Sequence, residues 1–292
     1  FAYLQDYCVQ WYICNGQTDH LIETGIDLYK LPLQEKKDIL CSCIYGIDID
    51  IHAVEVAKFS LLIKLIEDET APSVSEVVPI LPDLGDNIQF GNSLVSQTEL
   101  NGISGANHQM MEIAPFDWST INNGCGFDVI IGNPPYVNTE GMHALLPSAE
   151  VEIYKKKYKT SHKQFDKYFI FIEQAINKIN ENGLVCYIVP NKFFKIGAGE
   201  KLRNLIAKER MLVSLDDFGD AQLFEDKTIY SSIILLSKAK QTSFVYSSVD
   251  SANKLWAGEE VSSIELNSSI LNKLPWRLTT DFEFLTMLQR LD

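Results

Sequence analysis

Long apolar segments and closely spaced metal-ligand motifs are both missing from this sequence. No apolar run approaches the roughly 20 residues needed to cross a bilayer, and no charged-then-apolar signal segment opens the chain. The six cysteines are scattered, and the one close pair, Cys41 and Cys43, has a spacing that fits neither zinc nor redox motifs. We therefore expect no membrane partner, no bound metal, and reduced thiols in a cytoplasmic protein.

Basic residues are scarce relative to acidic ones. The 292 residues include 25 lysines and arginines against 39 aspartates and glutamates, which gives a net charge of −14. This balance argues against a surface that is basic all over, but it does not exclude a local basic groove. The length suits one large domain, or one domain with part of a second.

Strand and helix patterns alternate along the first 240 residues. Apolar runs predict strands at 39–47, 87–90, 128–132, 184–189, 211–218 and 230–237, and helical spacing predicts helices at 1–15, 52–67, 165–180 and 200–208. This alternation predicts an α/β fold, with a mostly parallel sheet that carries helices on both faces. The loop between the last two strands is too short for a helical crossover, so that final pair is expected to be antiparallel.

Three other segments have weaker patterns. Residues 22–38 are interpreted as a second helix, or as a helical hairpin interrupted at Pro32. Residues 96–124 are expected to form an irregular surface insertion, and residues 138–164 a polar loop region.

The middle of the chain contains a predicted strand that ends in a rigid turn. Val129, Ile130 and Ile131 form a continuous apolar run of the kind found in a strand buried on both faces. Gly132 ends the run, and Asn133-Pro134-Pro135-Tyr136 follows. Each proline fixes φ and removes a backbone donor. The turn therefore holds one amide and one aromatic ring at the carboxyl end of a strand, where open α/β sheets bind ligands.

Several stretches together resemble a known family. They are, in chain order, Tyr45–Asp50, Gly91–Leu94, Asn133–Tyr136, Gly183–Val185 with Val189–Asn191, and Leu223-Phe224. In this order they resemble the S-adenosylmethionine-dependent N6-adenine DNA methyltransferases with the gamma order of motifs, as in type IIG restriction–modification or phage-defence enzymes. The resemblance implies a Rossmann-like class I methyltransferase sheet, S-adenosylmethionine as cofactor and double-stranded DNA as partner.

The resemblance assigns the Asn133–Tyr136 turn to catalysis. The Asn133 side-chain oxygen and the Pro134 carbonyl would accept hydrogen bonds from the amine of a flipped-out adenine, and Pro135 belongs to the same rigid turn. Tyr136 would stack on the base, with Phe224 as a second stacking face. The alternatives are that Asn133 merely begins a turn and that Phe224 is a core aromatic.

The same resemblance assigns five residues to the cofactor. Asp48 would accept the ribose hydroxyls and Ile49 would lie against the adenine ring. Asn92, with Ser93 beside it, would bind the adenine edge, and Phe171 would contact the same ring. The alternatives are a helix cap at Asp48, for which Asp50 competes, a plain turn at Asn92, and core packing at Phe171.

One part of the family pattern is missing. The glycine-rich cofactor loop that ends the first strand of the sheet is absent, and Gly197-Ala198-Gly199 comes too late in the order to replace it. Without that first strand, the predicted strands 39–47 and 128–132 have no shared neighbour. We therefore expect the natural protein to extend upstream, and we expect this chain by itself to bind S-adenosylmethionine poorly or not at all.

The resemblance covers residues 1–240, expected to form the catalytic domain, whereas 241–292 would be a linker and the beginning of a target-recognition domain. The expected function is site-specific DNA (adenine-N6) methylation in a restriction–modification or phage-defence system, with a nuclease or specificity region elsewhere in the same polypeptide. The alternative substrates are a protein glutamine or an RNA guanine. A third class of function is a non-catalytic assembly subunit. The intact Asn133–Tyr136 tetrapeptide argues against this class.

Overall fold

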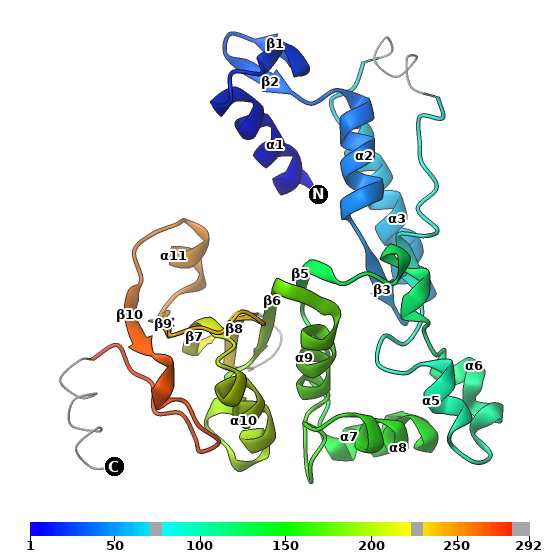
Figure 1. The fold of residues 1–292 in the computed structure, drawn as a ribbon, viewed down its shortest axis with the longest axis vertical. Helices are drawn as coiled ribbons and strands as arrows, with labels where there is room; N and C mark the ends of the chain where they lie inside the picture. The colour runs from blue at the N-terminus through cyan, green and yellow to red at the C-terminus, as the bar shows by residue number, and fades with distance from the viewer. Residues whose placement is uncertain (71–77, 223–229, 282–292) are drawn as a thin grey trace. The chain divides into compact units, whose positions relative to one another are not determined.

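The computed structural model describes residues 1–70, 78–222 and 230–281. It divides into two compact units, Phe1–Thr98 with Met110–Cys125, and Glu99–Gln109 with Gly126–Asp292. Helices and strands alternate through most of the chain (Figure 1), so the predicted α/β class is confirmed. None of the helices in the described residues is long and apolar enough to cross a membrane.

The first unit consists of helices and two small sheets. Its elements are α1 (Ala2–Cys14), β1 (Ile22–Gly25), β2 (Leu28–Lys30), α2 (Leu33–Cys43), β3 (Gly46–Asp48), α3 (Ile51–Ile66), β4 (Ile88–Phe90) and α6 (Met110–Ile113), and α5 (Gln97–Asn101) spans the boundary between the units. β1 and β2 pair antiparallel. β3 and β4 pair in parallel, with Asp48 opposite Phe90 at their carboxyl ends.

The core of the first unit lies between α2 and α3. Leu33, Leu40, Leu65 and Leu84 are each at most 3% exposed. Leu33 and Leu40 are seven residues apart, which places them on one face of α2. Burial of each such side chain stabilises the fold by roughly 1.5–3 kcal/mol, so this small cluster holds the two helices together.

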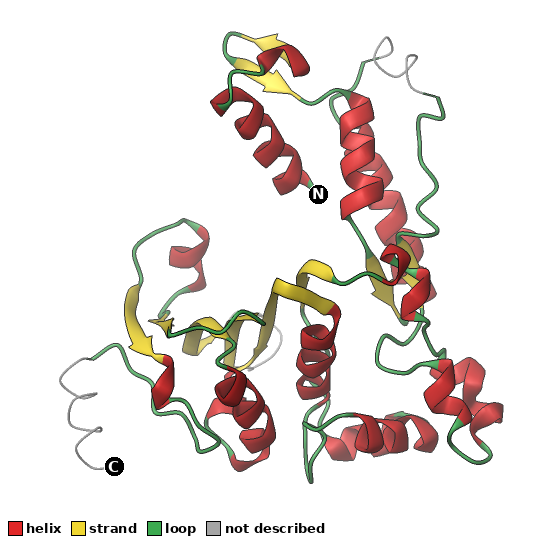
Figure 2. Cartoon of the chain, in the orientation of Figure 1, coloured by secondary structure: helices red, strands yellow, loops and turns green. Residues whose placement is uncertain are grey.

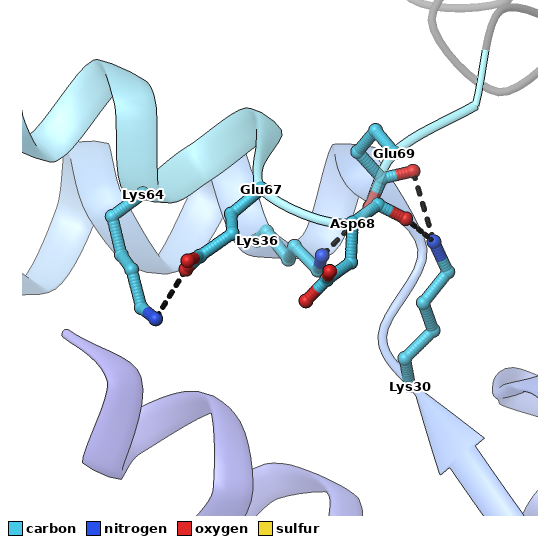
Figure 3. Close-up of polar contacts among 6 residues, drawn as sticks. All are labelled: Lys30, Lys36, Lys64, Glu67, Asp68 and Glu69. Atoms are coloured by element: carbon cyan, nitrogen blue, oxygen red, sulfur yellow. Dashed lines mark hydrogen bonds and ion pairs between the residues drawn. The ribbon is translucent and has the colours of Figure 1, made fainter.

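A buried ion-pair cluster ties β2 and α2 to the residues that follow α3 (Figure 3). The Glu69 side chain is 1% exposed and contacts the Nζ atoms of Lys36 at 2.6 Å and Lys30 at 3.2 Å. Lys30 Nζ also donates to the Asp68 carbonyl oxygen at 2.8 Å. The neighbouring pair of Lys64 and Glu67 is about half exposed. Of the pairs drawn in Figure 3, those of Glu69 are the more shielded from water, and exposed pairs contribute little.

Two predictions about the first unit are wrong. Residues 22–30 form a hairpin rather than a helix, and Asp27 at its turn has φ +55°, a conformation of tight turns. The strand predicted at 39–47 is mostly helix α2, and the chain becomes extended from Ile44 onward, before β3. Ile39 and Leu40 lie in a short apolar run, and such a run does not distinguish a buried strand from a buried helix.

The second unit contains a six-stranded sheet. Its elements are β5 (Phe127–Gly132), α7 (Thr139–Leu145), α8 (Ser148–Lys157), α9 (Lys167–Lys178), β6 (Ile179–Pro190), α10 (Glu200–Glu209), β7 (Leu212–Gln222), β8 (Tyr230–Ser237), β9 (Ser243–Ser248), α11 (Ala252–Trp256) and β10 (Ser262–Asn267). The strand order is β10-β9-β7-β8-β6-β5. Alternate residues of β6, among them Val185, Tyr187 and Val189, are buried.

The pairing in this sheet is mixed. β5 with β6 and β7 with β9 are parallel, whereas β6 with β8, β7 with β8, and β9 with β10 are antiparallel. The antiparallel β7–β8 pair agrees with the prediction for that short connection. The antiparallel part of this sheet is therefore larger than the single final strand that the sequence predicted. β8 lies between β6 and β7 and runs antiparallel to both.

One further feature of the second unit differs from the sequence interpretation. The region 138–164, expected to be a polar loop, contains the helices α7 and α8, shown in red in Figure 2. α8 buries Val151, Ile153 and Tyr154 although its overall composition is polar. Beyond residue 240, β9 and β10 join the same sheet as β5.

Candidate active site

Strand β5 delivers the predicted catalytic turn at the edge of the six-stranded sheet. Its last residues pair in parallel with β6, with Gly132 opposite Tyr187. A Cβ atom at Gly132 would lie 3.2 Å from Tyr187 Cε1, so the glycine permits close approach to that ring. Val129 and Ile131 are 56% and 76% exposed. The predicted burial of β5 on both faces is therefore wrong among the described residues, in which β5 is an edge strand with only β6 beside it.

The four residues of the turn differ in their exposure to solvent. Asn133 and Pro135 are exposed, whereas Pro134 is buried and Tyr136 is half-buried. The Asn133 side chain thus lies on the protein surface directly after a strand end. This is the arrangement in which a side-chain amide can meet a planar ligand.

The Tyr136 hydroxyl connects the turn to strand β6. Its Oη atom lies 2.6 Å from Asn133 Oδ1 and 2.9 Å from the carbonyl oxygen of Ile188. The tyrosine ring meets the ring of Tyr168 edge to face, with centroids 6.1 Å apart. Burial raises the pKa of Tyr136 to about 12, so its hydroxyl stays protonated at neutral pH.

Helix α9 supports the turn through Tyr168, which is fully buried. Phe171 lies one turn further along the same helix and is half-buried. Its predicted contact with the cofactor ring stays a prediction. Phe224, the predicted second stacking face, lies outside the described residues.

Asp48 and Asp50 have separate roles at the end of β3. Asp50 Oδ1 accepts from His52 N at 2.9 Å, which makes Asp50 the N-cap of helix α3. Asp48 is exposed, and its Oδ1 accepts from Asp50 N at 2.8 Å. Asp50, and not Asp48, therefore caps helix α3, so the alternative role of Asp48 as a helix cap is wrong. Ile49 between them is 50% exposed.

Asn92 is held inside the turn that follows β4. It is 4% exposed, its N–H donates to the Ala114 carbonyl at 2.6 Å, and its Oδ1 accepts from Leu94 N at 3.1 Å. Ser93 is half-buried, and its carbonyl accepts from Trp118 Nε1 at 3.0 Å. The local structure at Asn92 is thus a side-chain-stabilised turn, and its predicted cofactor contact stays a prediction.

An open cavity of about 300 Å³ lies beside this turn in the first unit. It is lined by Phe90, Gln97, Met110, Met111, Ala114 and Pro115. The sequence interpretation did not single out these residues, because Met110 and Pro115 come from a segment that looked irregular. Phe90, as the last residue of β4 opposite Asp48, is the one member that its strand position indicated.

The predicted residues fall into two sets. Asp48, Ile49, Asn92 and Ser93 belong to the first unit, and the Asn133–Tyr136 turn and Phe171 belong to the second. Within the second unit, the structure brings Asn133 and Tyr136 into direct contact. Within the first, it brings Asp48 and Phe90 to neighbouring strand ends.

Comparison with known proteins identifies similar sequences over most of the chain. The family described as Eco57I restriction-modification methylase matches residues 42–224. The type II restriction enzyme and methyltransferase RM.Eco57I of Escherichia coli is 40% identical over 280 residues, covering 95% of this chain and 27% of that protein. The type II methyltransferase M.PaeR7I of Pseudomonas aeruginosa is 31% identical over 113 residues, covering 38% of this chain and 19% of that protein.

A solved structure shares the fold. A chain in the cryo-electron microscopy structure of the DrdV–DNA complex superimposes with a TM-score of 0.58 at 14% identity, covering 87% of this chain and 26% of the other. The present chain thus spans about a quarter or less of the proteins it matches here.

Proposed function

The chain belongs to the Eco57I restriction-modification methylase family, and from this we propose that it methylates DNA at the exocyclic amine of adenine. The methyl donor in this proposal is S-adenosylmethionine, on a Rossmann-like sheet of the class I type. The single observation that carries the proposal is the exposed Asn133 amide at the carboxyl end of β5, inside an intact Asn-Pro-Pro-Tyr turn.

The adenine amine is a poor nucleophile because its lone pair is delocalised into the ring. Two acceptors at the turn, Asn133 Oδ1 and the Pro134 carbonyl oxygen, would each take one N–H of the amine and favour its pyramidal form. No base is required to remove a proton first. Positioned acceptors of this kind act where charge develops, and Pro135 keeps their geometry rigid.

The target base must leave the duplex to reach this turn. The half-buried Tyr136 ring, braced by Tyr168, is a stacking platform for the flipped base. Stacking on an aromatic side chain contributes roughly 1–3 kcal/mol per base. Phe224 is proposed as the second face of this slot.

Three side chains of the first unit fit the adenosine part of the cofactor. Asp48 offers an exposed carboxylate for the ribose hydroxyls, and Ile49 and Phe90, 50% and 45% exposed, offer apolar surface for an adenine ring. Asn92 fits less well, because it is only 4% exposed and its side-chain oxygen already accepts from Leu94 N. When bound, S-adenosylmethionine supplies an activated methyl group. Ser93 and Phe171 complete the proposed set.

The names of the relatives support a restriction–modification role and do not favour a protein glutamine or an RNA guanine as substrate. RM.Eco57I is named as both restriction enzyme and methyltransferase. We therefore propose that this chain is the methyltransferase part of a polypeptide that also carries a nuclease. Residues 1–240 would form the catalytic domain, and 241–292 the approach to a target-recognition domain.

A substrate-competition assay tests the proposal. The full-length protein is incubated with tritiated S-adenosylmethionine and a mixture of duplex DNA, RNA and protein, and label is counted in each fraction. The proposal predicts label in DNA, lost in Asn133→Ala. Label in RNA or protein alone would contradict it.

A further inference from the structure

The Tyr136 hydroxyl lies between two carbonyl-type oxygen atoms. Oη is 2.6 Å from the Oδ1 position of Asn133 and 2.9 Å from the carbonyl oxygen of Ile188. A phenol carries one hydrogen and can donate it to only one of these atoms at a time. If both neighbours are acceptors, one of the two short contacts brings lone pairs against each other.

The asparagine amide can relieve this conflict, whereas Ile188 cannot. The Ile188 carbonyl is part of the backbone and only accepts. The Asn133 amide has an acceptor oxygen and a donor nitrogen of nearly the same shape, and a half-turn of the amide exchanges them. After that turn, Asn133 Nδ2 donates to Tyr136 Oη, and Oη donates to Ile188. Both contacts are then hydrogen bonds.

We infer that the Tyr136 hydroxyl is a positioning group that turns the Asn133 amide so that its oxygen faces the substrate amine. The hydroxyl accepts from Asn133 Nδ2 and donates to the Ile188 carbonyl, which leaves Oδ1 free on the exposed side of the turn. This role is additional to stacking by the Tyr136 ring. It rests on the proposed function only in the identity of the amine that Oδ1 meets.

The surroundings of Tyr136 fix this relay in place. Ile188 lies near the carboxyl end of β6, where it pairs with Ile233 of β8, so its carbonyl is held by the sheet. The edge-to-face contact with buried Tyr168 holds the ring. Burial raises the pKa of Tyr136 to about 12, so the hydroxyl keeps the proton that the relay needs. Asn133 itself is exposed and depends on this contact for a fixed orientation.

Hydrogen exchange at the Asn133 side chain tests the relay without reference to activity. In the 15N-labelled chain, the two Nδ2–H signals are identified by their loss in Asn133→Ala. We expect one of these protons to exchange at least about tenfold more slowly than those of exposed asparagines, and Tyr136→Phe to abolish that protection. Unprotected Nδ2 protons, or protection unchanged in Tyr136→Phe, would overturn the inference.

Kinetics test the consequence for catalysis. Tyr136→Phe keeps the ring and removes only the hydroxyl, so we expect kcat to fall about tenfold while KM for DNA changes less than about twofold. Tyr246→Phe is the control, since it removes another sheet-bound hydroxyl, 3.4 Å from Asp217, without touching the turn. An unchanged kcat in Tyr136→Phe would contradict the positioning role. If no variant and no wild-type protein methylates DNA, the proposed function fails, and the exchange experiment still decides the relay.

Discussion

The residues of the Asn133–Tyr136 turn differ in exposure. Asn133 is exposed, Pro134 is buried, and the Tyr136 hydroxyl contacts the Asn133 side chain. The sequence predicted the rigidity of the turn because prolines fix φ. It did not predict the contact with Ile188, which lies 52 residues away from Tyr136 and becomes a neighbour only when β5 and β6 pair.

Asp48 and Asp50, at the end of β3 and just after it, also show what a sequence can and cannot assign. Both Asp48 and Asp50 were candidates for the helix cap, and only their backbone partners distinguish them. Asp50 binds His52 N, and Asp48 stays exposed. Asn92 is the opposite case. A Gly-Asn-Ser turn was visible in the sequence, but the burial of its asparagine depends on Ala114, from a segment that looked irregular.

Replacing Asp48 is expected to weaken cofactor binding selectively. Asp48→Ala removes the carboxylate proposed for the ribose, and charged hydrogen bonds of this kind contribute about 1.5–3 kcal/mol, or roughly 10- to 150-fold in Kd. Calorimetry with S-adenosylmethionine on the full-length protein measures the loss. Asp50→Ala is the matched control: it should cost about 1 kcal/mol of stability by removing the cap and leave the Kd within about twofold. Equal Kd values for wild type and Asp48→Ala would remove Asp48 from the cofactor site.

At the scale of elements, the sequence predicted the ends of helices and strands best where a capping residue or a chain-breaking residue marks them. Helix α3 begins at its aspartate cap, and β5 ends at the glycine before the prolines, as expected. The prediction was wrong for α2, whose apolar run is too short to show its period. It also missed α8, because this helix buries Glu150 and Tyr154 together, and a buried glutamate does not register as core in a sequence.

The buried ion pairs of Glu69 are expected to matter more than the exposed pair of Glu67 (Figure 3). Glu69→Ala leaves the Lys36 ammonium, 8% exposed, without its carboxylate, and breaking a buried pair costs about 3–5 kcal/mol. Glu67→Ala should change the free energy of unfolding by less than about 1 kcal/mol. Urea unfolding followed by circular dichroism measures both. Similar losses in the two variants would mean that burial does not control the strength of these pairs.

The turn before α10 depends on Gly199 for close packing. A Cβ atom there would lie 1.9 Å from the Phe193 carbonyl oxygen and 2.7 Å from Nη1 of buried Arg203, which itself donates to that carbonyl at 2.5 Å. Overpacking against backbone costs about 1–3 kcal/mol or more, so we expect Gly199→Ala to lower the free energy of unfolding by at least about 2 kcal/mol.

The matched control for Gly199 is two residues earlier. A Cβ atom at Gly197 meets nothing within 4 Å, so Gly197→Ala should be neutral within about 0.5 kcal/mol. Thermal unfolding of the two variants side by side is sufficient. A neutral Gly199→Ala would show that the loop can move away from the new methyl group, and the close approach would then be dispensable.

At the scale of the whole molecule, four of the five predicted cofactor residues, Asp48, Ile49, Asn92 and Ser93, belong to one compact unit, whereas Phe171 and the predicted catalytic turn belong to the other. The strands β3 and β5 are in separate sheets among the described residues, as expected for strands without a shared neighbour. The family and the α/β class follow from the order of the motifs, which survives errors in individual elements. The sheet pairing beyond β8 does not follow from motif order, because β9 and β10 come after the last of the motifs.

The central claim is that the Asn133–Tyr136 turn positions the amine of adenine for methylation. DNA incubated with the full-length protein and S-adenosylmethionine is digested to nucleosides and analysed by mass spectrometry, beside DNA treated with Asn133→Ala. Loss of one positioned hydrogen-bonding group at such a site costs about 10²–10³ in rate. The account predicts N6-methyladenine with the wild-type protein and at least about a hundredfold less with the variant. Methylation of cytosine instead, or equal N6-methyladenine from both proteins, would contradict it.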